Sequence, residues 1–293
     1  MKKSNFSTMA ILSLFLLIFT SIVLLSSCND DDDNTFEAPE SKKDINITNH
    51  PKLGNILTDK TGMTLYFFTP DINRPTICVE GCVIAWPVFY QENATIGFGL
   101  TKSDFGVVTR ADGKKQSTYK GWPLYFYQGD KSPGEVKGEA LENAWFVAKP
   151  DYTIMIGHGQ LIGEDGISYG KDYKPGQNRF TAYFTDDRGN ALYTFTKDTD
   201  KKNTYTSETD QTKNAVWPIF KSVKKVILPS LLKIADFESI TVFKDSQITF
   251  KGHPIYNFGR DKGFGDTKGV SVPLPGVWPV ATTIGIEIEL PSK

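Results

Sequence analysis

The chain is poor in the residues from which most catalytic and metal centres are built. It has three cysteines and three histidines in 293 residues, and the histidines, His50, His158 and His253, lie far apart. It contains no Gly-x-Ser-x-Gly elbow, no His-Glu-x-x-His pair and no Gly-x-x-x-x-Gly-Lys-Ser/Thr phosphate loop. Cys-x-x-Cys-His is also absent, which excludes covalent c-type haem. The sequence therefore predicts no catalytic residue and no cofactor, although carboxylate pairs brought together by folding stay open.

An excess of basic charge is also missing. The sequence has 33 Lys and Arg against 34 Asp and Glu. Lys2 and Lys3 belong to the leader described below, and removing them brings the net charge to about −3, with no basic stripe. Nucleic-acid binding needs clustered Lys and Arg to neutralise phosphates. We therefore expect no nucleic-acid partner.

The N-terminus has the pattern of a secretory signal. Lys2 and Lys3 precede an apolar run from about Met9 to Leu25, and small residues lead to Cys28. This order is similar to a lipobox, so we expect residues 1–27 to be a lipoprotein signal peptide and Cys28 to carry a lipid that partners the membrane. The run is short for a membrane span and is interrupted by Ser and Thr, which disfavours an uncleaved anchor.

Residues 28–50 are expected to be an acidic flexible tether. Four aspartates, Asp30 to Asp33, follow Cys28 almost directly, and the segment has few apolar residues. An acidic run behind a lipidated cysteine resembles the surface-export signal of outer-membrane lipoproteins. The expected location is the cell envelope, as an outer-membrane lipoprotein exposed at the surface.

The phrase Tyr-x-aromatic-x-x-Asp occurs four times, and a recurring unit of this kind determines the architecture. Its copies lie 59, 68 and 63 residues apart, and a tryptophan follows each copy by 15 to 19 residues. The repeat-motif residues are Tyr66, Phe68, Asp71, Tyr125, Tyr127, Asp130, Tyr193, Phe195, Asp198, Tyr256, Phe258 and Asp261, and the tryptophans are Trp86, Trp145, Trp217 and Trp278.

Alternate copies match better than neighbouring ones. Thr58–Tyr66 aligns with Thr185–Tyr193, and Thr118–Tyr125 aligns with Thr249–Tyr256. The units therefore follow the order A-B-A′-B′, one ancestral pair copied once. We assign residues 51–150 to the pair A-B, residues 151–180 to a connector that is loop-rich because it holds six glycines, and residues 181–290 to the pair A′-B′.

At these residues the chain resembles the bacterial secreted lipoprotein family with a conserved Yx(FWY)xxD motif, also called the secreted repeat of unknown function. The resemblance covers roughly residues 52–150 and 180–285 and is strengthened by Cys-x-x-x-Cys before Trp86-Pro87. It implies an envelope location and no established activity.

The fold is expected to be mainly β, with small antiparallel sheets that form a pseudo-twofold or propeller-like body, or two separate sandwiches. Asp112-Gly113 between β-branched runs predicts a hairpin in unit B, and Lys244–Ser246 holds the same place in B′. Pro123 and Pro254 should break the strand that follows. Lys221–Ser239 is the best helical candidate, although Pro229 interrupts it.

The motif itself favours a structural role. Its tyrosine and the aromatic residue two positions later lie on one face of a strand, and the aspartate at the strand end can accept backbone N–H groups of the turn. A calcium site at Asp198 and Asp200, or at Asp261 and Asp266, is the alternative, so a metal site stays undecided. The tryptophans are expected to fill the core rather than to serve as ligand platforms.

Cys78 and Cys82 are the remaining cysteines and are expected to form a disulfide in an oxidising compartment. Two functions stay open. The first is a non-catalytic surface module that binds an envelope protein or a glycan through exposed aromatic side chains at Tyr90, Phe98, Tyr169 and Tyr173. The second is a redox- or metal-associated envelope protein that uses the Cys78/Cys82 pair.

Overall fold

Each pair of repeat units is built around two antiparallel segments in which its motif tyrosines face each other. The computed structural model describes residues 42–73 and 76–282. In the first half, the Tyr66 N–H donates to the Tyr125 carbonyl at 2.8 Å, and the Tyr125 N–H donates back at 3.1 Å. In the second half, β11 (Leu192–Thr194) pairs with β14 (His253–Asn257), and Tyr193 lies opposite Tyr256. The two halves therefore have equivalent central pairs of tyrosines.

The same neighbours flank both tyrosine pairs. β3 (Tyr66–Phe68) pairs with β7 (Trp145–Val147), which places Val147 beside Tyr66. Val88 bridges to Tyr125 on the other side. In the second half, the equivalent bridges join Val280 to Tyr193 and Ile219 to Tyr256. Both ladders thus have the order expected of a duplicated pair.

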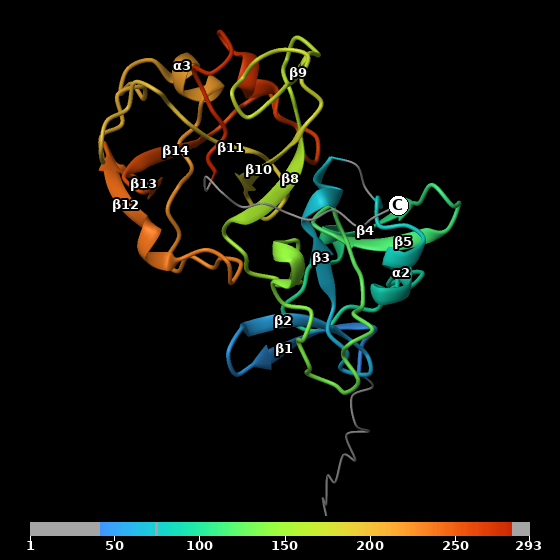
Figure 1. Ribbon diagram of the computed structural model, residues 1–293. Coiled ribbons are helices and arrows are strands. Elements are labelled where there is room, and N and C mark those ends of the chain that lie inside the picture. The colour runs from blue at the N-terminus through green and yellow to red at the C-terminus, as the bar shows by residue number, and fades with distance from the viewer. Residues whose placement is uncertain (1–41, 74–75, 283–293) are drawn as a thin grey trace, which may run out of the picture. The chain divides into compact units, whose positions relative to one another are not determined.

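Each unit also has an antiparallel pair of strands. In the A units these are β1 (Ile45–His50) with β2 (Gly54–Asp59), and β8 (Met155–Ile162) with β10 (Phe180–Thr185), while β9 (Ser168–Tyr169) extends β8. In the B units they are β4 (Phe105–Thr109) with β5 (Lys115–Tyr119), and β12 (Phe237–Val242) with β13 (Asp245–Phe250). The mainly β fold of small antiparallel sheets is confirmed, and so are both predicted hairpins (Figure 1).

The expected strand breaks at the prolines do not occur. Pro123 lies in β6 (Trp122–Pro123) opposite Thr118, and Pro254 lies inside β14 opposite Thr249. The next residue resumes the ladder, since the Leu124 N–H donates to the Ser117 carbonyl at 3.0 Å. A proline is tolerated because its missing donor falls between two ladder bonds.

Two segments expected to be irregular are strands. Ile45–His50, placed in the tether, forms β1, and Ile45 is fully buried. Met155–Ile162, placed in the connector, forms the buried strand β8. Its glycines are required by close packing, because a Cβ on Gly157 would meet Ile72 at 2.8 Å and one on Gly159 would meet Asn73 at 2.6 Å. β8 pairs with β10 as β1 pairs with β2, so β8 is the first strand of unit A′.

The helical interpretation of Lys221–Ser239 is wrong. This segment contains a short 3-10 helix at Ile234–Asp236, and β12 begins at Phe237. Its leucines pack against a buried apolar cluster while the chain runs extended, and the Ile227 carbonyl accepts the Thr153 N–H at 2.9 Å. Among the described residues, the α-helices are α2 (Gly81–Ala85) and α3 (Gln211–Val216), each directly before a unit's tryptophan.

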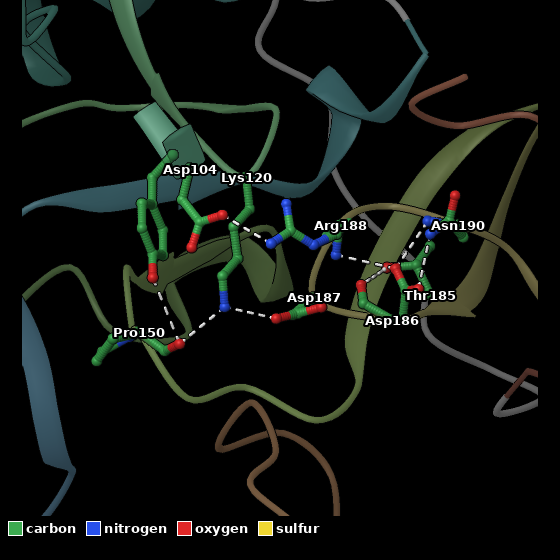
Figure 2. A network of polar contacts seen from close by, with 9 residues as sticks. Asp104, Lys120, Pro150, Thr185, Asp186, Asp187, Arg188 and Asn190 are labelled. Carbon is green, nitrogen blue, oxygen red and sulfur yellow. Dashed lines mark hydrogen bonds and ion pairs between the residues drawn. The ribbon is translucent and has the colours of Figure 1, made fainter. Parts of the chain in front are cut away.

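The two halves contact each other through apolar packing and ion pairs. Trp122 of the first half lies edge-on to Phe264 of the second, with ring centroids 5.0 Å apart. Figure 2 shows the polar contacts: Lys120 Nζ lies 2.5 Å from Asp187, and Arg188 reaches Asp104 at 2.6 Å. The described residues from Lys42 onward therefore form one compact unit.

The close packing at each half's centre leaves no room for an added methyl group. A Cβ on Gly138 would lie 2.7 Å from Trp86 and 2.8 Å from Tyr66, whereas one on Gly81 meets nothing within 4 Å. We expect Gly138→Ala to lower the free energy of unfolding by about 1–3 kcal/mol, as overpacked cores do. Gly81→Ala, the control, should be neutral or slightly stabilising because Ala is the better helix former. Urea titration measures both, and equal stabilities would contradict this packing.

Candidate functional site

The motif tyrosines and aspartates bond to each other across the unit pair rather than within one copy. The Tyr66 hydroxyl of unit A donates to Asp130 of unit B at 2.6 Å, and Tyr125 of B donates to Asp71 of A at 2.7 Å. The second half repeats the exchange, with Tyr193 donating to Asp261 and Tyr256 to Asp198, both at 2.6 Å. Each unit thus supplies one donor and one acceptor to its partner.

Each aspartate also accepts a backbone N–H from the turn that follows it. The donors are Ile77 to Asp71, Lys137 to Asp130, Thr204 to Asp198 and Lys268 to Asp261, at 2.7–3.0 Å. The turn contact expected from the sequence is therefore present. The phenol partner was missed, because nothing within a single copy indicates that its tyrosine reaches the aspartate of another copy.

Burial governs the ionisation of these groups. It raises the pKa of Asp71 to about 7 and that of Asp261 to about 6, although the phenol and backbone donors oppose the shift. Burial also raises the pKa of Tyr125 and Tyr193 well above the usual range, so both phenols remain donors. Because Asp71 is fully buried, its shifted pKa reflects a structural contact rather than an accessible general base.

The tryptophans also make contacts between the two units of a pair. Trp86 stacks on Trp145 with ring centroids 3.7 Å apart, and Trp217 stacks on Trp278 at 3.9 Å. The third motif residue of each unit packs on the tryptophan of the other unit: Phe68 on Trp145, Tyr127 on Trp86, Phe195 on Trp278 and Phe258 on Trp217. All four tryptophans are buried, so they fill the core.

The other sequence candidates have varied environments. In the described part of the chain, no group of three or more His, Cys, Asp or Glu side chains could hold a metal ion. Asp266 accepts N–H groups of Lys262 and Gly263 beside Asp261. His158 is buried, which lowers its pKa to about 4. Cys28 lies outside the described residues.

Two of the four aromatic residues expected at the surface are not available there. Tyr90 and Phe98 are exposed. Tyr169 is buried and donates to Asp165 at 2.6 Å. The Tyr173 hydroxyl accepts the Val280 N–H at 2.8 Å, which holds this side chain against the second half's ladder. Sequence missed these contacts because both tyrosines lie in a glycine-rich stretch that looks like a loop.

The halves differ at the crevice between the short helix and the B-unit hairpin. In the first half the predicted disulfide joins Cys78 to Cys82, and the buried Arg110 guanidinium fills the crevice. It donates to the Cys78 carbonyl and to Gln116 Oε1, both at 2.5 Å. In the second half the equivalent Gln247 Oε1 accepts from Asn203 instead, at 2.8 Å.

The second half has an open groove at this place, with a volume of about 700 Å³. Thr206, Ser207 and Gln211 line the side next to α3, and Val242, Phe243 and Lys244 line the side of the β12–β13 hairpin. Val108 lies opposite Gln116, and Ile240 lies opposite the equivalent Gln247. Two residues further along the chain are Arg110 and Val242, so Val242 occupies the position of Arg110. The exchange of a long cation for a short apolar side chain therefore leaves the crevice unfilled.

The raised pKa of Asp71 predicts a pH-dependent stability. An unfolded Asp titrates near 3.9, so the folded chain binds the extra proton between about pH 4 and 7. The free energy of unfolding should therefore fall as the pH rises through this window.

Asp71→Asn should flatten this dependence, measured by urea titration at several pH values. Tyr125→Phe should extend it to higher pH, because the phenol that opposes the rise of the Asp71 pKa is removed. Identical slopes in the wild type and both variants would contradict the shifted pKa.

The described residues include no helix long and apolar enough to cross a membrane. No curated protein and no solved structure is significantly similar to the chain. A family model described as "secreted repeat of unknown function" matches residues 48–90 and 106–149, one segment in each unit of the first half. The description as secreted agrees with the export signal expected from the sequence. Over these two segments the chain matches the family of the secreted repeat of unknown function.

Proposed function

We propose that this protein is a non-catalytic binding module of the cell envelope, lipid-anchored through Cys28 and displayed on the outer surface. The leader at residues 1–27, the acidic run behind Cys28 and the family's description as secreted support the location. The tether and the lipid bring the module to the membrane, and the described body carries the ligand site. Protease treatment of intact cells tests the display, and complete protection would contradict it.

The observation that carries the binding role is the open groove of the second half. The two halves have the same ladder, the same Tyr–Asp exchange and the same tryptophan stack, so the groove is not required by the fold. The first half closes the equivalent crevice with Arg110, which is buried. A concave site of this volume lies within the range of roughly 300–1,000 Å³ typical of ligand pockets.

The Cys78–Cys82 pair is better explained as a structural staple than as a redox centre. Cys78 is fully buried, whereas reactive thiols need access and an activating partner. In the second half, the side chain of Asp210 caps α3 by accepting the Lys213 N–H at 2.9 Å. Hydrogen bonds there replace a bridge worth about 2 kcal/mol in the chain-entropy model.

Restoring the arginine to the second half tests the proposal. We expect Val242→Arg to fill the groove and abolish binding of any probe that raises the melting temperature of the wild-type chain. The probes are neutral oligosaccharides, short peptides and phospholipid vesicles. Val107→Arg is the control, because it adds the same charge at an exposed position of the first half's hairpin.

A probe that binds the wild type and Val107→Arg, but not Val242→Arg, supports the groove as the ligand site. Equal binding by all three chains, or binding of no probe at all, would contradict it. A free thiol found by thiol titration, a metal found by elemental analysis or a visible absorbance band in the purified chain would favour the redox alternative instead.

A further inference from the structure

We propose that the groove of the second half binds a neutral oligosaccharide, with one sugar ring stacked on Phe243. The inference rests on the proposed function and adds the class of ligand. Three properties of the groove carry it: its charge balance, its hydrogen-bonding groups and the conformation of Phe243.

The groove is balanced in charge. Glu208 and Asp245 contribute two negative side chains, and Lys221 and Lys244 contribute two positive ones. Lys221 and Asp245 pair at 3.0 Å. A strongly anionic or cationic ligand would meet like charge along part of the groove, and specificity commonly comes from such repulsion. The lining therefore fits a neutral polar ligand.

The groups left for a ligand match hydroxyls. In the described structure, the Glu208 carboxylate and the Lys244 ammonium have no ion-pair partner, and Gln211 uses its amide nitrogen on the Glu208 carbonyl at 3.2 Å. The groove thus offers acceptors at Glu208 and at the Gln211 amide oxygen, together with donors at Lys244. A sugar hydroxyl both donates and accepts, so one ligand can satisfy all of these groups.

Phe243 is the most informative residue of the groove. Its side chain is 53% exposed, and it belongs to none of the hydrophobic clusters found among the described residues. Its φ is +52°, in the region that favours Gly or Asn and that is uncommon for a bulky residue. A glycine would fit this turn better, so the fold gains little from the ring.

An exposed aromatic ring on a constrained turn is suited to recognition. The turn joins β12 and β13 and holds the ring beside the polar groups of the groove. Aromatic rings bury large apolar areas with few rotatable bonds, and a sugar ring presents apolar C–H faces between its hydroxyls. Phe243 therefore supplies the apolar contact, and Glu208, Gln211 and Lys244 supply the directional bonds.

The test uses the exported chain with Cys28→Ser, which keeps every described residue. Laminarihexaose, cellohexaose, maltohexaose and chitohexaose are titrated and followed by amide NMR shifts, with a neutral hexapeptide and an oligogalacturonate as competing classes. We expect at least one neutral oligosaccharide to shift the resonances of Gln211 and Phe243. Phe243→Gly should weaken its affinity at least tenfold, and Phe243→Tyr should retain it.

Phe243→Gly also separates a binding role from a folding role. Because glycine relieves the positive φ, this variant should melt at the wild-type temperature or above it while losing the sugar. Phe98→Ala, which removes another exposed ring away from the groove, should keep the wild-type affinity.

The outcomes distinguish the ligand class from the groove itself. Binding of the peptide or of the anionic sugar in the groove, without the neutral sugars, overturns the ligand class and leaves the proposed function standing. Unchanged sugar affinity in Phe243→Gly also overturns it. If no probe shifts groove resonances, both the inference and the proposed function fail.

Discussion

The fold depends on the exchange of a buried tyrosine hydroxyl and a buried aspartate between paired units. Two such bonds of 2.6–2.7 Å join the paired units within each half. A hydrogen bond to a charged group contributes about 1.5–3 kcal/mol, and a buried carboxylate without its donors is costly. Because each unit holds only half of two bonds, a single unit would leave a phenol and a carboxylate unpaired. This explains in physical terms why the units occur in pairs.

The stacked tryptophans follow from the same exchange. The reciprocal backbone bonds between Tyr66 and Tyr125 bring the two chain segments close together, and Trp86 and Trp145 stack face to face beside them. Gly138 and Gly269 complete the arrangement, because each N–H donates to a motif hydroxyl at 3.3 Å while the missing side chain leaves room for a tryptophan. The motif residues therefore hold the two units of a pair together, and the surface elements around them are free to differ.

That freedom is visible where the halves diverge. The first half closes its crevice with Arg110 and staples its short helix with Cys78 and Cys82. The second half has Val242 and hydrogen bonds in these places, and its crevice is open. The two halves thus share one framework but differ at this place, where the second has an open groove with a constrained, exposed Phe243.

The repeat order, both B-unit hairpins and the disulfide could be predicted from the sequence, because each depends on local patterns or on two residues close in the chain. β8 could not, since Gly157 and Gly159 look like loop residues and are explained only by the packing of Ile72 and Asn73. The leucines near Pro229 have a spacing that resembles a helix, but they pack on an apolar cluster made by other parts of the chain. The Tyr–Asp partners and the groove depend on which units pair and on what fills the space between them, so no single copy of the motif reveals them.

The exchange is tested most directly by double-mutant cycles on Tyr193. The account predicts that Tyr193→Phe couples with Asp261→Asn, of the partner unit, by at least about 1 kcal/mol in the free energy of unfolding. With Asp198→Asn, which alters the aspartate of its own motif copy, the coupling should stay within about 0.5 kcal/mol of zero. Coupling to Asp198 and none to Asp261 would contradict the exchange between units.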